Sequence, residues 1–231
     1  MMELAGLDVV IRLHDISELP RLDHCLFSLL GQSIPVTSDA DHCEPLWLHL
    51  MLHRFSFAEA QVVRSATQAL RPLDKTASLT MHNWELPEPF DLRVPLLNWG
   101  LEVTKCRYFT CIGVGDLLLP GAYAKLLARL RLTGAAMAVG RVITQRVRWW
   151  GDVVLPLVEI PPRSAFVPSR PEGADALPVF LLDRARLPTH DLVFRVGHPD
   201  GEVAEFMQRL RSQYDIDTRY MTDLLGVHQV L

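Results

Sequence analysis

Polar residues of the types that bind phosphate groups or metal ions follow directly after three apolar stretches of the sequence. His14 and Asp15 come after residues 7–13, His53 and Arg54 come after residues 47–52, and the run Gly-Val-Gly-Asp at 113–116 comes after residues 108–112. An arginine side chain holds a phosphate group through two hydrogen bonds, and a carboxylate such as that of Asp116 offers the oxygen ligands that Mg²⁺ prefers. The three positions therefore predict a site for an anionic or metal-bound ligand, provided that the fold brings them together.

The elements that must position these residues alternate between apolar strands and amphipathic helices along the chain. Expected strands lie at residues 7–13, 47–52, 77–81, 108–112 and 179–182, with a last strand and a tail in 214–231. Residues 135–150 are expected to form a long strand or a hairpin. Expected helices cover residues 17–30, 57–70, 96–104 and 201–213, and another begins near Pro120. This order predicts an α/β fold with a mostly parallel, doubly wound sheet flanked by helices. Such sheets bind ligands beyond the carboxyl ends of their strands, where the three polar positions would meet in one cleft.

Local signals set several of these boundaries. Ser56 and Glu59 have the spacing of a capping box, which predicts a helix start at residue 57. Gly140 predicts a bend or a bulge in the long strand that surrounds it. Prolines predict loops at residues 82–95 and 156–178, because proline removes a backbone hydrogen-bond donor.

The composition excludes several classes of protein. The chain has 231 residues, of which 49% are hydrophobic, and this is enough for one large α/β domain with a substantial core. The net charge of −4 argues against nucleic-acid binding through phosphate neutralisation. No apolar run approaches the ~20 residues needed to span a bilayer, and no signal peptide is recognisable. Four cysteines without a C-x-x-C pair suit a reducing compartment, so we expect a cytoplasmic protein, with a peripheral contact with the inner membrane left open.

The stretch 96–127, LLNWGLEVTKCRYFTCIGVGDLLLPGAYAKLL, resembles the centre of the family 2 glycosyltransferases, inverting enzymes with the GT-A nucleotide-sugar fold. In that family a helix leads into a buried strand, the strand ends in an Asp-x-Asp turn, and an apolar LLLPGA-like helix follows. The segments VVIRLHD and CLFSLLGQS resemble the first strand and helix of the same family, where the helix ends in SLLAQT. The resemblance implies a single GT-A-like domain over residues 1–231, with a nucleotide-binding half at 1–134 and an acceptor-side half at 135–231.

The aspartates that the family uses at the turn are absent from this chain. Gly113 and Gly115 stand where the family has its two metal-binding aspartates, and Asp116 is the carboxylate left beside them. Because glycine has no side-chain oxygen, Mg²⁺ or Mn²⁺ would depend on Asp116 with backbone groups and water, which is a weak site. His53 and Arg54 occupy part of the family's Asp-Asp-Gly-Ser motif, and their positive charge could neutralise a diphosphate without metal, as in some GT-A enzymes.

The resemblance also implies roles for residues outside the three strand ends. The family's general base lies at the start of a late helix, where this chain has Glu202 as the nearest match and Asp200 as the next. Acids at a helix start also cap free N–H groups and stabilise the helix dipole, so a structural role remains an alternative for both. His228 falls where many relatives have a histidine that contacts metal or diphosphate, and Arg93 and Asn98 lie in a segment that contacts the nucleotide.

Two functions from different classes follow from the resemblance. The first is an inverting glycosyltransferase, metal-independent or with an altered metal site, that acts in surface polysaccharide or natural-product assembly. Its donor substrate would be a nucleotide sugar, and its acceptor is unknown. The second is a pseudoenzyme that keeps the fold and binds a sugar ligand or regulates a partner enzyme. A different nucleotide-using transferase is a third alternative, because a fold does not determine a function. A homo-oligomer and a complex with a partner glycosyltransferase are both left open.

Overall fold

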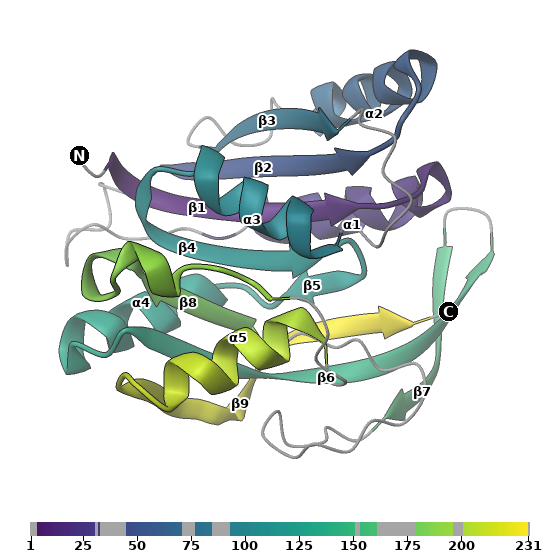
Figure 1. Ribbon diagram of the computed structural model, residues 1–231. Coiled ribbons are helices and arrows are strands. Elements are labelled where there is room, and N and C mark those ends of the chain that lie inside the picture. The colour runs from purple at the N-terminus through teal and green to yellow at the C-terminus, as the bar shows by residue number, and fades with distance from the viewer. Residues whose placement is uncertain are drawn as a thin grey trace.

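The computed structural model describes residues 4–30, 32, 45–70, 77–84, 93–150, 153–160, 179–195 and 201–230. These residues form a mixed α/β fold, in which a curled, mostly parallel sheet is flanked by helices, so the predicted fold class is confirmed (Figure 1). The strands are β1 (Leu4–Leu13), β2 (Leu46–His53), β3 (Ala77–Trp84), β4 (Cys106–Gly113), β5 (Asp116–Leu118), β6 (Met137–Trp150), β7 (Val153–Ile160), β8 (Val179–Asp183) and β9 (Ile216–Val230). The main helices are α1 (Leu19–Leu30), α2 (Phe57–Leu70), α3 (Arg93–Val103), α4 (Ala122–Thr133) and α5 (Glu202–Arg211), and the short 3₁₀ helix η1 (Ile16–Glu18) precedes α1.

Four parallel strands, in the order β3-β2-β1-β4, form one half of the sheet, and their arrowheads in Figure 1 point the same way. β2 and β4 are almost wholly buried apolar runs, as expected for strands that are covered on both faces. The register pairs Arg12 of β1 with Gly113 of β4, and Leu13 of β1 with Leu52 of β2. These strands therefore end level with one another, and their common edge carries the three predicted polar positions.

Alternate side chains of the strands build two hydrophobic cores, one on each face of the sheet. On one face, α1, α2 and α4 pack against strand residues such as Ile11 and Leu50. On the other face, α3 and α5 pack against residues such as Val10 and Phe109. In the described part of the chain, no helix has the length and apolar character needed to cross a membrane.

The second half of the chain continues the sheet and then returns to the turn after β4. β6 runs antiparallel to β8 and parallel to β9, and β9 pairs antiparallel with the short strand β5. The ladder between β6 and β9 shifts register on both sides of Gly140, where a Cβ atom would lie 2.2 Å from Leu225 Cδ1. The predicted irregularity at Gly140 is therefore confirmed, because this close approach leaves no room for a side chain.

Two of the predicted loops are partly wrong. β3 continues to Trp84, and α3 begins at Arg93. Pro95 is tolerated in α3 because it lies in the first turn, where backbone N–H groups make no hydrogen bond within the helix. Residues 156–160 belong to β7, which pairs with β6 in the described sheet. Pro156 is tolerated there because it lies on an edge strand beside a register shift. The remaining residues of this predicted loop, 161–178, lie outside the described residues.

A buried carboxylate ties the start of β4 to β1 and β2. Asp8 is 2% exposed, and its Oδ2 accepts the backbone N–H groups of Lys105 at 2.7 Å and Cys106 at 2.6 Å. Its Oδ1 lies 2.9 Å from Nε2 of His49. Asp8 therefore satisfies two backbone donors at the point where the chain leaves α3 and enters the sheet.

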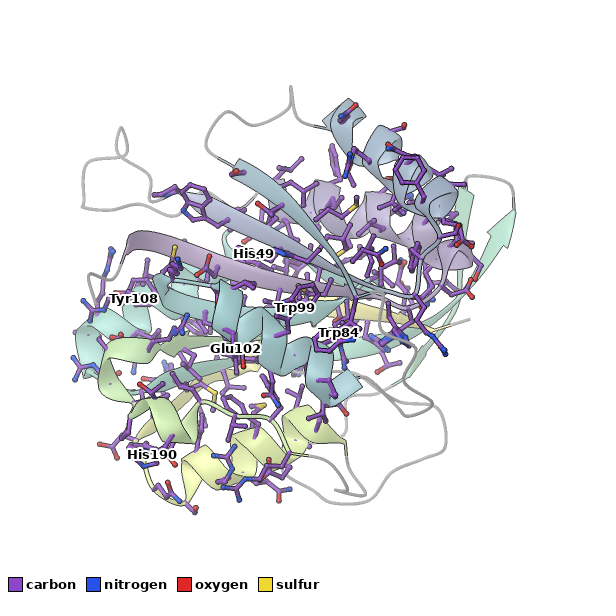
Figure 2. The ribbon with its side chains drawn as sticks, turned by 45° about the horizontal axis from the view of Figure 1, so that its top comes forward. His49, Trp84, Trp99, Glu102, Tyr108 and His190 are labelled. Carbon is purple, nitrogen blue, oxygen red and sulfur yellow. The ribbon has the colours of Figure 1, made fainter. Side chains whose placement is uncertain are left out.

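Aromatic rings continue this network to the edge of the sheet. His49 stacks on His82 of β3, and Trp99 of α3 contacts both His82 and Trp84 edge-on. Figure 2 shows His49, Trp84 and Trp99 gathered on this side of the molecule. The network fixes α3 on the first three strands, whose carboxyl ends form the common edge.

We expect Asp8→Ala to lower the free energy of unfolding by about 3 kcal/mol, because it leaves the buried N–H of Cys106, the partly buried N–H of Lys105 and the His49 ring without their acceptor. Chemical denaturation followed by circular dichroism measures the change. Asp215→Ala, at an exposed position, is the matched control and should change stability by less than about 0.5 kcal/mol. Equal effects of the two substitutions would show that the Asp8 network contributes nothing.

Candidate functional site

The turn between β4 and β5 is closed by the side chain of Asp116. Val114 and Gly115 form the turn, and Asp116 begins β5, so a short strand follows the predicted turn before α4. Asp116 Oδ2 accepts the backbone N–H of Gly113 at 2.6 Å. The carboxylate is thus held by the backbone of the strand that precedes it.

The last strand brings His228 onto the same carboxylate. Asp116 lies opposite His228 in the β5–β9 ladder, and the His228 Nδ1 atom is 2.6 Å from Asp116 Oδ1. The backbone N–H of Gln229 donates to the carbonyl oxygen of Gly115 at 2.8 Å. The structure therefore places the predicted residues Asp116 and His228 in direct contact.

An ion pair brings α5 to the end of β1. Arg12 Nη1 lies 2.5 Å from Glu202 Oε1, and each side chain is 11% exposed. The N-cap position of α5 is Gly201, with φ of 89°, so the helix begins one residue later than predicted. The helix begins later because the backbone of Gly201 has a positive φ, a conformation that glycine adopts readily but that is not helical. Asp200, the other predicted acid, lies outside the described residues.

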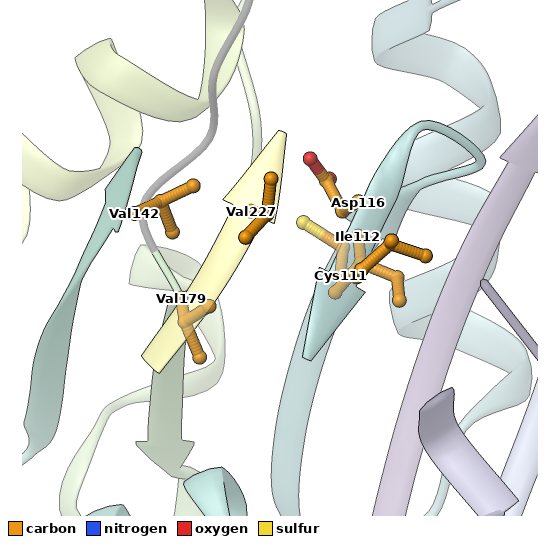
Figure 3. Close-up of a pocket in the computed structure, with 7 residues that line it drawn as sticks. Cys111, Ile112, Asp116, Val142, Val179 and Val227 are labelled. Atoms are coloured by element: carbon orange, nitrogen blue, oxygen red, sulfur yellow. The ribbon is translucent and has the colours of Figure 1, made fainter. Parts of the chain in front are cut away.

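A small pocket lies beside the turn, between strands from both halves of the sheet. It is lined by Cys111, Ile112, Asp116, Leu117, Val142, Val179 and Val227. Figure 3 shows Cys111 and Asp116 on one side and the three valines on the other. Burial raises the pKa of Cys111 to about 12, although the nearby Arg12 cation opposes this shift. The thiol is therefore protonated at neutral pH and behaves as an apolar group, which leaves Asp116 as the charged group of the lining.

The end of β2 carries a strained arginine. Arg54 has φ of 58°, a left-handed conformation that is uncommon for residues other than glycine, and its backbone N–H donates to the Trp84 carbonyl at 3.0 Å. Burial and the charge of Arg54 lower the pKa of the neighbouring His53. His53 is therefore neutral at pH 7, and the exposed Arg54 supplies the permanent positive charge of this strand end.

Residues after β1 organise the loop that leads into α1. The side chain of Asp15 accepts the backbone N–H of Ser17 at 2.8 Å, and this hydrogen bonding lowers the pKa of the carboxyl group. The backbone N–H of His14 donates to Glu18 Oε2 at 3.1 Å. Asp15 thus caps η1, and the His14 ring lies at an exposed position on the same edge.

Arg93 and Asn98 of α3 were predicted to lie in a segment that contacts the nucleotide. No contact in the described part of the chain brings either of them to the turn. The Asn98 side chain donates to the carbonyl of Phe194 at 3.0 Å and accepts the backbone N–H of Phe194 at 2.8 Å. Both polar atoms of Asn98 are therefore used to hold the segment before α5. Arg93 is the first residue of α3, and the structure describes its backbone only.

The residues at the turn do not fit a divalent cation. Both oxygens of Asp116 already contact protein groups, and Gly113 and Gly115 have no side-chain oxygen. In the described segments no group of three His, Cys, Asp or Glu residues could hold a metal ion. Hard cations need several oxygen ligands, so the turn as built is unsuited to Mg²⁺ or Mn²⁺.

Sequence reasoning missed two arginines at this edge. Arg12 is paired with Glu202, and Arg21 of α1 has Nη1 3.6 Å from the position that a Cβ atom of residue 115 would occupy. A charged residue near the end of an otherwise apolar strand was a usable signal for Arg12. Arg21 gives no such signal, because an arginine in the first turn of an amphipathic helix is usually a solvated residue.

The comparisons with solved structures show which fold this is. S. aureus TarS 1–349 matches with a TM-score of 0.63 and 14% sequence identity, over 97% of this chain and 60% of that one. The mannosyltransferase PcManGT from Pyrobaculum calidifontis, in complex with GDP-Man and Mn²⁺, matches with a TM-score of 0.61 and 11% identity, over 97% of this chain and 57% of that one. No family model matches the sequence, and no curated protein does.

These similarities establish the fold and not the activity, because the identities are low. The chain spans 60% or less of the length of these structures, and 37% of the longer TarS chain. The chain therefore has the mixed α/β fold of these glycosyltransferases.

Gly115 and Gly113 should respond differently to substitution. A Cβ atom at residue 115 would lie 2.8 Å from the backbone oxygen of Gln229, whereas one at residue 113 would lie 3.2 Å from Asp116 Oδ2, the end of a side chain. We expect Gly115→Ala to lower the free energy of unfolding by about 2 kcal/mol, since a paired backbone must move, and Gly113→Ala to cost less than about 1 kcal/mol. Denaturation of both variants measures this, and an equal cost would contradict the packing of β9 on the turn.

Proposed function

We propose that this chain is a GT-A-like, family 2-type glycosyltransferase that transfers a sugar from a nucleotide sugar to an acceptor hydroxyl group, without a metal ion held by the turn. Two contacts at the ends of the paired strands β1 and β4 carry the proposal: Glu202 contacts Arg12 near the end of β1, and His228 contacts Asp116 just after β4. Residues 1–134 would bind the nucleotide, and residues 135–231 would contribute the acceptor side.

The structures that share the fold support a nucleotide sugar as the donor. TarS 1–349 has been solved with UDP and with UDP-GlcNAc, and PcManGT with GDP-Man and Mn²⁺. Open α/β sheets bind ligands beyond the carboxyl ends of their strands, which is the edge where the acids and the arginines of this chain meet. Arg54 would contact the donor phosphates there, and its strained backbone supports a functional role, since strain of this kind clusters at binding sites.

Glu202 would act as the general base. Its Oε1 is held by Arg12, and its Oε2 would accept the proton of the acceptor hydroxyl group. As the acceptor oxygen bonds to the anomeric carbon, the bond from that carbon to the β-phosphate oxygen breaks. Its electron pair leaves with the nucleoside diphosphate, so charge is balanced and the anomeric centre is inverted. Arg54 would offset the charge that develops on the leaving group.

A second candidate function is that of a non-catalytic protein that binds a sugar nucleotide or a partner enzyme. It is favoured by the internal pairing of both acids at the edge, Asp116 with His228 and Glu202 with Arg12. An acid that already contacts a basic side chain of its own chain is less available to a substrate. Binding and turnover measurements on the same protein separate the two functions.

Calorimetry with UDP-, GDP-, TDP- and CMP-sugars tests donor binding. We expect one of them to bind in the presence of EDTA, because the turn does not supply a metal site. Arg54→Ala should weaken that binding about tenfold, the equivalent of one lost charged hydrogen bond. Arg64→Ala, at an exposed position of α2, is the matched control and should bind as the wild type does. If no nucleotide sugar binds under any condition, the proposed function is wrong.

Turnover tests the role of Glu202. If Glu202 is the base, Glu202→Gln should reduce the rate of transfer by at least ~100-fold while donor affinity is kept. Glu205→Gln removes an acid from the same turn of α5 and serves as the control for helix-dipole effects. A near-wild-type rate for Glu202→Gln would remove this assignment, and donor binding without turnover in the wild type would favour the non-catalytic function.

A further inference from the structure

We propose that Arg21 stabilises the diphosphate of the donor beside Gly115 and takes the place of a metal ion there, an inference that rests on the proposed function. Arg21 lies in the first turn of α1, directly after the loop and η1 that follow β1. Its Nη1 is 3.6 Å from the position of a Cβ atom on residue 115, and His228 Cε1 is 3.7 Å from the same point. The guanidinium group thus lies beside the space into which an aspartate at this position would extend.

The backbone of β9 keeps that space free of a carboxylate. The Gln229 N–H is bonded to the Gly115 carbonyl at 2.8 Å, and the Gln229 carbonyl oxygen would be 2.8 Å from a Cβ atom on residue 115. Any side chain at this position would force two paired strands apart. The close approach of β9 and a metal-binding aspartate at residue 115 therefore exclude each other in this fold.

Because residues 113 and 115 carry no carboxylate, less positive charge is needed to bind a diphosphate beside them. Two carboxylates next to a diphosphate repel it, and a divalent cation offsets that repulsion. Where both positions are glycine, their share of this repulsion is absent, while the carboxylates of Asp116 and Glu18 remain near the turn. One guanidinium group can then stabilise the diphosphate through two hydrogen bonds.

Glu18 holds Arg21 in position without using the atom nearest Gly115. Arg21 Nη2 donates to Glu18 Oε1 at 2.6 Å, while Glu18 Oε2 accepts the backbone N–H of His14. The side chains of Arg21 and Glu18 are 19% and 20% exposed, so the pair is partly accessible to solvent. A diphosphate would bind at Nη1 while the contact with Glu18 remains, and Glu18 would weaken that binding by its negative charge.

Calorimetry in EDTA with UDP and GDP, and with uridine and guanosine as ligands without phosphate, tests this role. Arg21→Ala should weaken binding of the diphosphate at least about tenfold and leave nucleoside binding unchanged, and Arg21→Lys should restore part of the loss. Glu18→Gln keeps the shape of the pair and removes the negative charge, so it should tighten diphosphate binding about two- to fivefold. Arg64→Ala is the control, and thermal melting confirms that each variant is folded.

The outcomes separate this inference from the proposed function. If the wild type binds UDP or GDP in EDTA and Arg21→Ala binds it equally well, Arg21 has no such role while the proposed function stands. If binding requires Mn²⁺, the inference is overturned in the same way. If Arg21→Ala is unstable, the result rests on Glu18→Gln, where unchanged or weaker binding would contradict the inference. If neither nucleotide binds under any condition, the inference fails together with the proposed function.

Discussion

The last strand, β9, closes the turn between β4 and β5 through its backbone as well as through a side chain. Gln229 donates to the Gly115 carbonyl, and His228 contacts Asp116. These two contacts determine which residues the turn accepts, because the space above residue 115 is taken by a backbone oxygen. The glycine there is required by packing, because the returning strand leaves too little space for a side chain at residue 115.

Several acids at the edge of the sheet contact basic side chains of the chain itself. Glu202 contacts Arg12, Glu18 contacts Arg21, and Asp116 contacts His228. Charges that are partly removed from water need such partners, since an isolated buried carboxylate is costly. An anionic ligand entering this edge therefore exchanges its contacts with water for contacts with arginines that are already oriented by their acids.

Local patterns predicted most of the fold, because β1, β2 and β4 are short, mostly apolar runs and α1 and α5 have a clear amphipathic face. The capping box at Ser56 and Glu59 forms as predicted, with reciprocal hydrogen bonds. Pro156 shows where such patterns fail. A proline was interpreted as part of a loop, yet an edge strand accepts it, and no local signal tells an edge strand from a loop.

The candidate site was predictable only in part, because its members meet through tertiary contacts. The strand ends followed from the topology, and Glu202 and His228 were chosen by resemblance alone. The pairing of Arg12 with Glu202, 190 residues later, leaves no trace in local sequence. The left-handed backbone of Arg54 and the approach of Gln229 to Gly115 depend on neighbouring strands, so they also could not be predicted from the residues themselves.

The residues at this edge lie far apart along the chain, and this affects the order in which the protein folds during synthesis. During synthesis, β1 to β4 can assemble as soon as they leave the ribosome, because they are consecutive parallel strands linked by helices. The partners from α5 and β9 are translated after these strands, and the entropy of closing such long loops is offset only when they dock. The nascent chain therefore carries the first strands of the sheet before their edge is complete, because that edge also needs residues of α5 and β9.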